Sequence, residues 1–281
     1  MLKKNGLDLK KLLPLTDAIL KTKYLPVKKF SPKVKLFIER DRFIIKTAEN
    51  HDELVNVLRL RYEVFYRELL EKRRIYGFDI DRFDFKCDHL IIIDKKSGQF
   101  IGTYRLVSSL FAKKFYSETE FDISNILALP GVKLELGRAC VHKDYRTGSS
   151  IALLWRGITE YMKLTDTQYL FGCSSVKVTD LHEIASMYQV LARDFMAPSN
   201  LFVYPKRRFT IKNFKELNAR VSDDDMLSVV EKIPPLIKSY LNMGAHICGE
   251  PALDKKFRCA DFLTLFNTDT SAEKIHKKYK L

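Results

Sequence analysis

Residues 133–162 read KLELGRACVHKDYRTGSSIALLWRGITEYM. The first part, Lys133–Val141, predicts a β-strand. The turn Arg146–Ser150 follows and leads directly into a helix, because apolar residues then recur on one helical face at Ile151, Leu154, Trp155, Ile158 and Met162. This segment therefore predicts a strand, a glycine-containing turn and a helix in immediate succession.

Segments on both sides extend this unit. Arg42–Lys46 predicts a strand, and Asn50 with Glu53 resembles a capping box at the start of a helix that runs to about Lys72. Leu90–Asp94 and Phe100–Val107 predict a hairpin that turns at Ser97-Gly98. Further strands are predicted at Tyr169–Cys173, Ala245–Gly249 and Phe257–Phe266, and further helices at Thr179–Ala192 and Ile233–Leu241. The order predicts an α/β fold: a central sheet of mixed direction with helices on both faces.

The composition is that of a soluble globular protein, with 46% apolar and 30% charged residues, but the formal net charge is +14. Residues 1–50 hold 13 Lys and Arg against 5 Asp and Glu, so the positive charge is concentrated there. Such a field favours an anionic partner: nucleic acid, an anionic membrane or an acidic protein. We find no nucleic-acid-binding motif, and so expect no nucleic acid partner.

Three regions are expected: a basic extension over residues 1–40, the main domain over 41–270 and a basic tail over 271–281. Leucines and lysines alternate near the start of the extension, which fits either an amphipathic element on a membrane or an arm packed over the domain. No apolar run approaches the ~20 residues of a membrane-spanning helix, and no signal peptide is recognised. The five cysteines are scattered singly, so we expect no metal site and a reducing, cytoplasmic location. The positive charge favours peripheral contact with the inner membrane face.

Two groups of charged residues fall in the N-terminal half. Arg61 lies on or beside the apolar stripe of the first long helix, where it either meets an anionic partner or extends its head to water. Four aspartates follow within ten residues, and their mutual repulsion requires solvation, ionic pairing or a bound cation. The alternatives are an amine-binding site and a solvated loop paired with Arg73, Arg74 and Arg82; the four are Asp79, Asp81, Asp84 and Asp88.

The strand at 133–141 carries two charges, Glu135 and Arg138. In a regular strand they would face opposite sides, and a bulge near Gly137 would change that. Charged groups in a central strand must be paired or functional, so Glu135 is either a functional carboxylate or the partner of Arg105 in a buried ion pair.

The turn Arg146-Thr147-Gly148-Ser149-Ser150 stands at a helix N-terminus, whose free N–H groups favour an anion. It either binds a phosphate or serves as a helix cap through Ser149 or Ser150.

Together these motifs resemble the bacterial ornithine-lipid N-acyltransferases, often called hemolysin-like, and more weakly the acyl-homoserine-lactone and N-acyl amino acid synthases. The similarity is carried by Arg61–Phe65 (RYEVF), the Asp79–Asp84 cluster, Gly102–Leu106 (GTYRL), Glu135–Arg138 (ELGR) and Tyr240–Phe262. It spans roughly residues 47–266.

The resemblance implies an N-acetyltransferase-like (GNAT) fold and transfer of a long-chain 3-hydroxyacyl group from acyl carrier protein to the α-amine of ornithine, giving a lyso-aminolipid. No permanently bound cofactor is implied, since the acyl-carrier-protein thioester is a co-substrate. The turn departs from the Arg/Gln-x-x-Gly-x-Gly/Ala pattern of coenzyme-A-dependent relatives, because one residue separates Arg146 from Gly148 and Ser150 replaces the last small residue. A carrier protein presents one phosphate and needs less of that cradle. The net charge fits this donor, because acyl carrier proteins are acidic.

On this basis Glu135 is the expected general base, with Arg105 and Arg138 beside it. The acceptor site is expected to be formed by Arg61, Phe65, Asp79, Asp81 and Asp84. Arg61, Arg105 and Arg138 would organise the acidic cluster and bind the acceptor carboxylate, and Asp81 or Asp84 would steer the acceptor's ammonium group. Backbone N–H groups near Ala139–Val141 would hold the oxyanion. The donor phosphate is expected at Val141, Arg146, Gly148, Ser149 and Ser150. A covalent route through Cys140 or Cys173 is disfavoured, and Cys140 is expected in the core.

Two other functions remain open. One is a coenzyme-A-dependent N-acetyltransferase that acts on a small amine. The other is a non-enzymatic basic module that binds membrane or nucleic acid, although such a module would not explain Glu135 within a strand.

Overall fold

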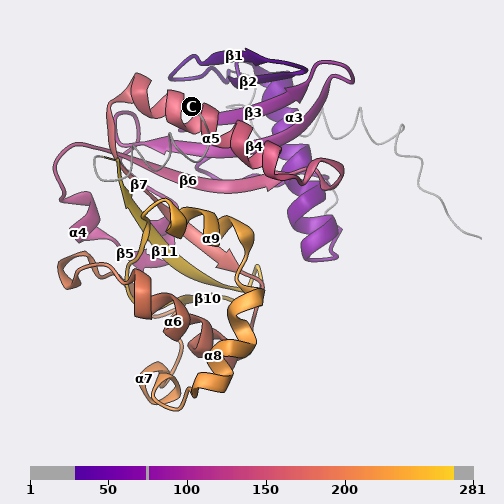
Figure 1. The fold of residues 1–281 in the computed structure, drawn as a ribbon. Helices are drawn as coiled ribbons and strands as arrows, with labels where there is room; N and C mark the ends of the chain where they lie inside the picture. Colours follow the sequence, from indigo (N-terminus) through magenta and orange to yellow (C-terminus); the bar gives the residue numbers. More distant parts are fainter. Residues whose placement is uncertain (1–28, 74–75, 269–281) are drawn as a thin grey trace, which may run out of the picture.

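The computed structural model describes residues 29–73 and 76–268, which form a mixed β-sheet with helices packed around it (Figure 1). The predicted tail 271–281 and most of the predicted extension lie outside the described residues, and so does the leucine- and lysine-rich segment. Within the described ranges, no helix combines the length and apolar character needed to cross a bilayer.

The strands are β1 Phe37–Arg40, β2 Phe43–Thr47, β3 Asp88–Asp94, β4 Gln99–Ser108, β5 Phe121–Asp122, β6 Val132–Val141, β7 Thr167–Val176, β8 Tyr204–Pro205, β9 His246–Ile247, β10 Ala252–Asp254 and β11 Cys259–Asn267. The α-helices are α3 His51–Tyr62, α4 Ser124–Leu127, α5 Gly148–Thr165, α6 Leu181–Phe195, α7 Phe214–Asn218, α8 Asp223–Val229 and α9 Pro235–Asn242. A π-helix, η1, covers Glu63–Leu69, and short 3₁₀ turns cover Ser117–Thr119 (η2), Lys143–Tyr145 (η3), Ser199–Leu201 (η4) and Val230–Lys232 (η5).

The main sheet has the strand order β1-β2-β3-β4-β6-β7-β11-β10, with β9 paired to β11. Its neighbouring strands are antiparallel except for β6 and β7, which are parallel. A parallel pair needs a crossover, and α5 provides it. The predicted mixed sheet is confirmed, and so is the strand–turn–helix unit from which it was inferred.

The sheet begins earlier than the predicted domain start at residue 41. β1 pairs with β2 from Phe37 to Arg40, and the backbone N–H groups of Lys33 and Val34 donate to the carboxylate of Asp88 at 2.6 and 3.0 Å. The last residues of the segment predicted as an extension are therefore integrated into the sheet edge.

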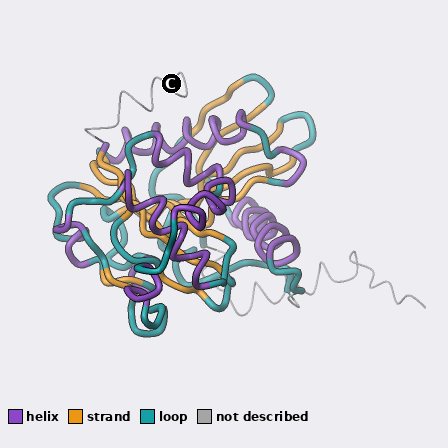
Figure 2. Tube along the Cα trace, turned by 60° about the horizontal axis from the view of Figure 1, so that its bottom comes forward, coloured by secondary structure: helices purple, strands orange, loops and turns teal. Residues whose placement is uncertain are grey.

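Helices cover both faces of the sheet (Figures 1 and 2). Leu90 and Ile92 of β3 belong to the buried cluster that contains Trp155 of α5, whereas Ile91 packs with Val57 of α3. Since consecutive strand residues face opposite sides, α3 and α5 lie on opposite faces. The α6–α8 group covers the end of the sheet near β10 and β11, as Figure 1 shows.

The helix predicted to reach Lys72 changes character at residue 62. It starts where expected, since the Asn50 side chain accepts from the backbone N–H of Glu53 at 3.0 Å. The capping box is incomplete, because the Glu53 carboxylate accepts from Glu49 rather than from Asn50. After Tyr62 the chain continues as the π-helix η1, a geometry that is frequent near functional sites.

Candidate active site

The parallel strands β6 and β7 separate at one end. Their pairing begins at Val132 and stops at Glu135, opposite Phe171. A Cβ on Gly172 would lie 2.3 Å from the carbonyl oxygen of Leu136, so glycine is required where the two backbones make their last close contact. Cavities lie between the strands beyond this fork.

A β-bulge lies in β6 where it borders the fork. One β4 residue, Tyr104, faces two β6 residues, Arg138 and Ala139, and Arg138 adopts a left-handed conformation with φ 51°. Such a conformation costs a non-glycine residue about 1–2 kcal/mol. The extra residue places Arg138 on the same cavity wall as Glu135. The bulge considered near Gly137 is therefore present.

Arg61 is fully buried and lies between two aspartates of the acidic loop. Its Nε donates to Asp79 at 2.8 Å, and its two terminal nitrogens donate to Asp84 at 2.7 and 3.2 Å. All three side chains are at most 2% exposed. The alternative of a solvated acidic loop is wrong for Asp79 and Asp84.

Arg105 and Arg138 complete this network. Arg105 donates to both oxygens of Asp81 at 2.8 and 2.7 Å and to Asp84 at 3.3 Å. Arg138 donates to Asp81 at 3.1 Å, and its Nε lies 3.4 Å from Asp79. Three guanidinium groups thus face three carboxylates, and we call these six residues the Arg–Asp network.

The Arg–Asp network favours the ionised form of Asp79 and Asp81. Burial by itself would raise the pKa of Asp79 and Asp81, but attraction from the three arginines outweighs it and holds both pKa values below their usual range. Asp88 is separate: it accepts from the Tyr161 hydroxyl at 2.8 Å. Since each aspartate of the network is already paired with a guanidinium group, these aspartates are occupied within the protein rather than open to a substrate ammonium.

Glu135 does not pair with Arg105. Its two oxygens accept backbone N–H groups from Tyr116 at 2.8 Å and Ser117 at 2.6 Å. The side chain is buried, with 2% exposure, yet it borders the cavity. Burial raises the pKa of Glu135 even though both N–H groups favour the ionised form. A carboxylate with a raised pKa is a stronger base than an ordinary one.

The larger cavity at the fork has a volume of about 210 Å³. Its charged wall is built by Arg105, Glu135, Arg138, Lys177, Asp254 and Asp261. Its apolar wall comes from the π-helix, the bulged strand and two C-terminal segments: Phe65, Leu69, Leu70, Leu136, Leu236 and Phe257. Of the five expected acceptor-site residues, Phe65 lines this cavity, whereas Arg61, Asp79, Asp81 and Asp84 lie behind it. The site thus combines an apolar surface with a buried carboxylate and guanidinium groups.

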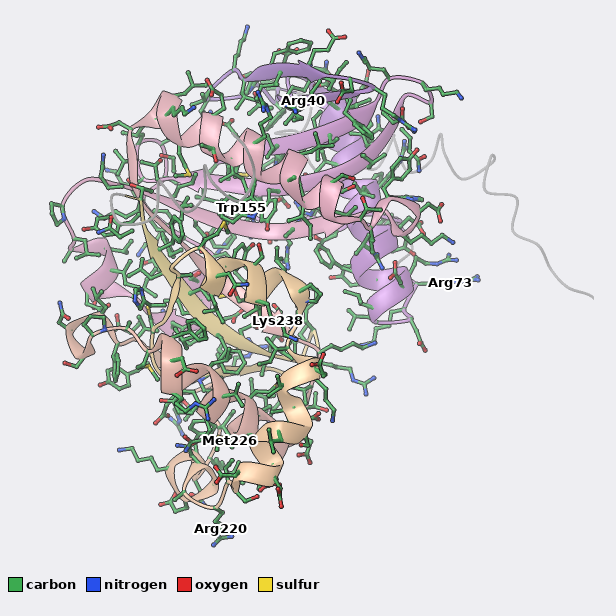
Figure 3. The ribbon with its side chains drawn as sticks, viewed as in Figure 1. Arg40, Arg73, Trp155, Arg220, Met226 and Lys238 are labelled. Atoms are coloured by element: carbon green, nitrogen blue, oxygen red, sulfur yellow. The ribbon has the colours of Figure 1, made fainter. Side chains whose placement is uncertain are left out.

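A second cavity of about 80 Å³ lies on the other side of the bulge and shares Leu136 and Ala139 with the first. Trp155 and Tyr240 form part of its wall. Their rings pack edge to face at 5.8 Å, so the indole lies between α5 and α9 (Figure 3). The fork therefore has two cavities that share part of their walls.

The turn before α5 lies on the outer side of the fork. The Nε of Arg146 donates to the carbonyl of Val141 at 3.1 Å, and its terminal nitrogens pair with the exposed Glu68. Helix α5 begins at Gly148, and Thr147 precedes it without a side-chain cap. Capping by Ser149 or Ser150 is therefore wrong. The Ser150 hydroxyl donates to the carbonyl of Tyr145, while Ser149 lies beside a shallow surface hollow.

The cysteines do not offer a nucleophile. Cys140 is buried in the cluster of Leu60 and Val64, as expected for a core residue, and burial raises its pKa to about 12. Burial also raises the pKa of Cys173 well above its ordinary value. Since the thiolate is the reactive form, a covalent route through either cysteine is disfavoured.

A second acidic group, which was not predicted from the sequence, is formed by Glu120, Asp254 and Asp261. One oxygen from each lies within 4.8 Å of the others, and all three residues are buried. The three residues come from the loop before β5, from β10 and from β11, so no local spacing in the sequence predicts that they lie together. The sequence around Asp261 (CADFLTLF) is rich in strand-forming residues, so it predicts a buried strand. An aspartate in such a strand must be paired or functional, and this was the signal that could have identified the group.

Known proteins similar to this chain indicate its fold and family. Residues 60–156 match the family model described as an acetyltransferase (GNAT) domain. The L-ornithine Nα-acyltransferase of Rhizobium meliloti is 32% identical over 78% of this chain and 77% of its own length, and that of Rhodobacter capsulatus is 29% identical over 84% and 93%. Among solved structures, the acyl-homoserine-lactone synthase LasI aligns over 84% of this chain and 95% of its own, with 13% identity and a TM-score of 0.48.

The two acyltransferase similarities extend over most of both chains, and the family-model match includes β6, the turn and the first part of α5. The expected N-acetyltransferase-like fold is confirmed, and the chain is an enzyme of the acyltransferase class. The chain belongs to the family of the L-ornithine Nα-acyltransferases.

Proposed function

We propose that this enzyme transfers a long-chain, 3-hydroxylated acyl group from acyl carrier protein to the α-amine of L-ornithine, which yields a lyso-aminolipid. One observation carries the proposal. At the β6 bulge, Glu135 and Arg138 lie on the wall of a cavity whose remaining surface is largely apolar. An acyl chain, an amine and a carboxylate are the groups that such a cavity accommodates.

The reaction proceeds by direct transfer. Glu135 accepts a proton from the α-ammonium, directly or through water, and the free amine attacks the thioester carbonyl carbon. The C–N bond forms, the C–S bond breaks, and the phosphopantetheine sulfur leaves and is protonated to the thiol. Backbone N–H groups of β6 between Ala139 and Val141 stabilise the oxyanion, because β6 is no longer paired with β7 there.

The arginines position the acceptor. Arg105 and Arg138 line the cavity, whereas Arg61 lies behind them. We assign the acceptor carboxylate to Arg138, whose side chain borders the cavity, with Phe65 packing beside it. The buried Asp79, Asp81 and Asp84 act indirectly, since they hold the arginines in place.

The donor phosphate binds at the turn before α5. Gly148 and Ser149 present the N-terminus of an 18-residue helix, and Arg146 lies beside it. The phosphate would exchange with Glu68 as the partner of Arg146. The carrier protein is acidic, so the charge of +14 assists its docking and also favours contact with an anionic membrane, where the product accumulates.

The test is mass spectrometry of products from 3-hydroxypalmitoyl-acyl carrier protein and L-ornithine, beside the matched coenzyme A thioester. We expect Nα-acylornithine from the carrier-protein donor. Product from coenzyme A alone would instead support the coenzyme-A-dependent alternative. Absence of product from both donors, together with binding to anionic vesicles, would favour the non-enzymatic module and contradict the proposal.

A further inference from the structure

The acidic group Glu120, Asp254 and Asp261 is built by the β10–β11 hairpin and one loop. Asp261 pairs with Ala252 across the hairpin, and Asp254 lies two residues further along β10 on the same face. The Ser175 hydroxyl of β7 donates to Asp261. Glu120 follows the turn η2 directly. The backbone N–H groups of Ser117, the first residue of η2, and of Tyr116 before it donate to the Glu135 carboxylate. The acidic group and the base are thus held by the same turn.

This acidic group differs from the Arg–Asp network because it lacks a cation. No Lys, Arg or His of the described ranges forms an ion pair with any of its three carboxylates within 4.0 Å, although all three are at most 5% exposed. One oxygen of Glu120, Oε2, is buried without a hydrogen-bond partner. A buried, unpaired carboxylate oxygen is costly unless a ligand satisfies it.

The mutual repulsion of these carboxylates is visible in their protonation. Burial and the nearby Asp261 raise the pKa of Glu120 to about 9, and burial raises the pKa of Asp261 as well. Glu120 therefore favours its protonated form at neutral pH in the free enzyme. A cation bound among them would relieve the repulsion.

The acidic group is accessible from the active-site cavity. Asp254 and Asp261 line the same cavity as Glu135 and Arg138. A molecule that occupies this cavity can therefore place one group at Glu135 and another at the acidic group. An acceptor with two amines meets both positions at once.

We propose that Glu120, Asp254 and Asp261 bind the side-chain ammonium of the acceptor amino acid. This inference rests on the proposed N-acyltransfer and deepens it, because it assigns the residues that hold the second, terminal amine of the acceptor. It also explains selectivity between the two amines. Carboxylates stabilise the ammonium form, which is not nucleophilic, so acylation is directed to the α-amine next to Glu135.

The test compares L-ornithine with L-norvaline, which has the same carbon chain without the terminal amine. We expect kcat/KM to be at least about 100-fold higher for ornithine, because a site built for a polar group rejects an analogue that lacks it. Asp261→Asn should lower kcat/KM for ornithine at least about 30-fold, mainly through KM, and leave norvaline within about three-fold. Asp261 is preferred over Asp254, whose oxygen also accepts from Lys256 and Phe257 in the hairpin turn.

Glu160→Gln is the matched control, since Glu160 is a surface residue of α5 with 42% side-chain exposure. This variant should leave kcat/KM unchanged for both ornithine and norvaline. Thermal unfolding of each variant shows whether the fold is retained. Fragmentation of the product should also show more terminal-amine acylation in Asp261→Asn than in the unmodified enzyme.

Equal use of norvaline and ornithine would overturn the ammonium site while leaving N-acyltransfer intact. An equal loss for both substrates in Asp261→Asn would do the same. If EDTA abolishes activity and Mg²⁺ or Ca²⁺ restores it, the acidic group holds a metal ion instead. If no amine is acylated, calorimetric titration still decides: ornithine should bind the unmodified protein more tightly than norvaline does, and Asp261→Asn should remove the difference.

Discussion

The Glu135 carboxylate contacts both a neighbouring turn and the cavity. Its oxygens hold the backbone of Tyr116 and Ser117, and its carboxylate also borders the cavity. The first contact orders the turn that carries Glu120. The second makes Glu135 the carboxylate of β6 available as a base. A substitution at this residue therefore affects positioning and proton transfer together, and the two must be separated by measurement.

We expect Glu135→Gln to lower kcat about 10²- to 10⁴-fold, the usual contribution of a positioned general base. In the unmodified enzyme, kcat/KM should fall as the pH drops through the raised pKa of Glu135, because only the ionised form accepts a proton. That acidic limb should lie above the ordinary value of 4.5 and should be absent from the residual activity of the variant. The measurement is kcat/KM against pH for both proteins.

Glu135→Asp serves as the companion variant, since it retains a carboxylate. It should keep an acidic limb even where its rate is lower. If Glu135→Gln retains activity within a few-fold and the limb persists, Glu135 only positions the turn and the base lies elsewhere. Chemical unfolding of both variants measures the cost of losing one N–H contact, about 1–3 kcal/mol.

At the scale of elements, the fork between β6 and β7 creates the site. The parallel pair is held together up to Glu135 and Phe171, and Gly172 permits the last close approach. The bulge in β6 then turns Arg138 toward the cavity. The π-helix η1 adds Phe65 and Leu69 from the opposite side. Backbone irregularities in two adjacent elements, rather than regular strands and helices, shape the cavity.

We predict that Gly172→Ala destabilises the protein and lowers activity. The added methyl would lie 2.3 Å from the carbonyl of Leu136, so the strands must move apart. Such overpacking costs about 1–3 kcal/mol, and the shift reaches the oxyanion-binding segment directly. Equilibrium unfolding in urea measures the free energy, and steady-state kinetics measures the rate.

Gly148→Ala is the control for stability, because its Cβ meets no atom within 4 Å and its φ is not positive. Alanine at the start of α5 should be neutral or stabilising by up to about 1 kcal/mol. If Gly172→Ala is as stable as Gly148→Ala, the contact between β6 and β7 is looser than the structure indicates.

At the scale of the molecule, charge and topology serve different steps. The net charge of +14 acts at a distance and favours encounter with an acidic donor protein or an anionic membrane. The Arg–Asp network is neutral and acts at short range, since it fixes the arginines at the cavity. Encounter should therefore depend strongly on salt, whereas chemistry should not.

We expect the KM for acyl-acyl carrier protein to rise roughly ten-fold between about 50 mM and 500 mM NaCl, with kcat little changed, because salt screens attraction between exposed charges. The matched acyl-pantetheine, which carries no protein and no phosphate, should show little change in KM. A similar salt effect on both donors would exclude electrostatic docking of the carrier protein as its cause.

Much of the fold follows from local sequence, because local patterns determine local structure. The hairpin at Ser97-Gly98, the Asn50 cap and the strand–turn–helix of residues 133–162 all form as expected. Solvation, ionic pairing and a bound cation were the alternatives for the acidic cluster, and Asp79, Asp81 and Asp84 are all paired with arginines. Helices α7 and α8 were not predicted, since segments of five and seven residues are too short to show a helical period of apolar residues.

The sequence by itself determined the fold class, the family resemblance and the presence of Glu135 and Arg138 in a central strand, because these depend on residue order and periodicity. The tertiary structure alone decided which charges meet. Arg61 reaches Asp84 across a loop, and the β10–β11 hairpin brings Asp261 to Glu120. Contacts between distant segments depend on strand register, on one bulge and on loop paths, and these are set by packing of the whole chain rather than by any local pattern.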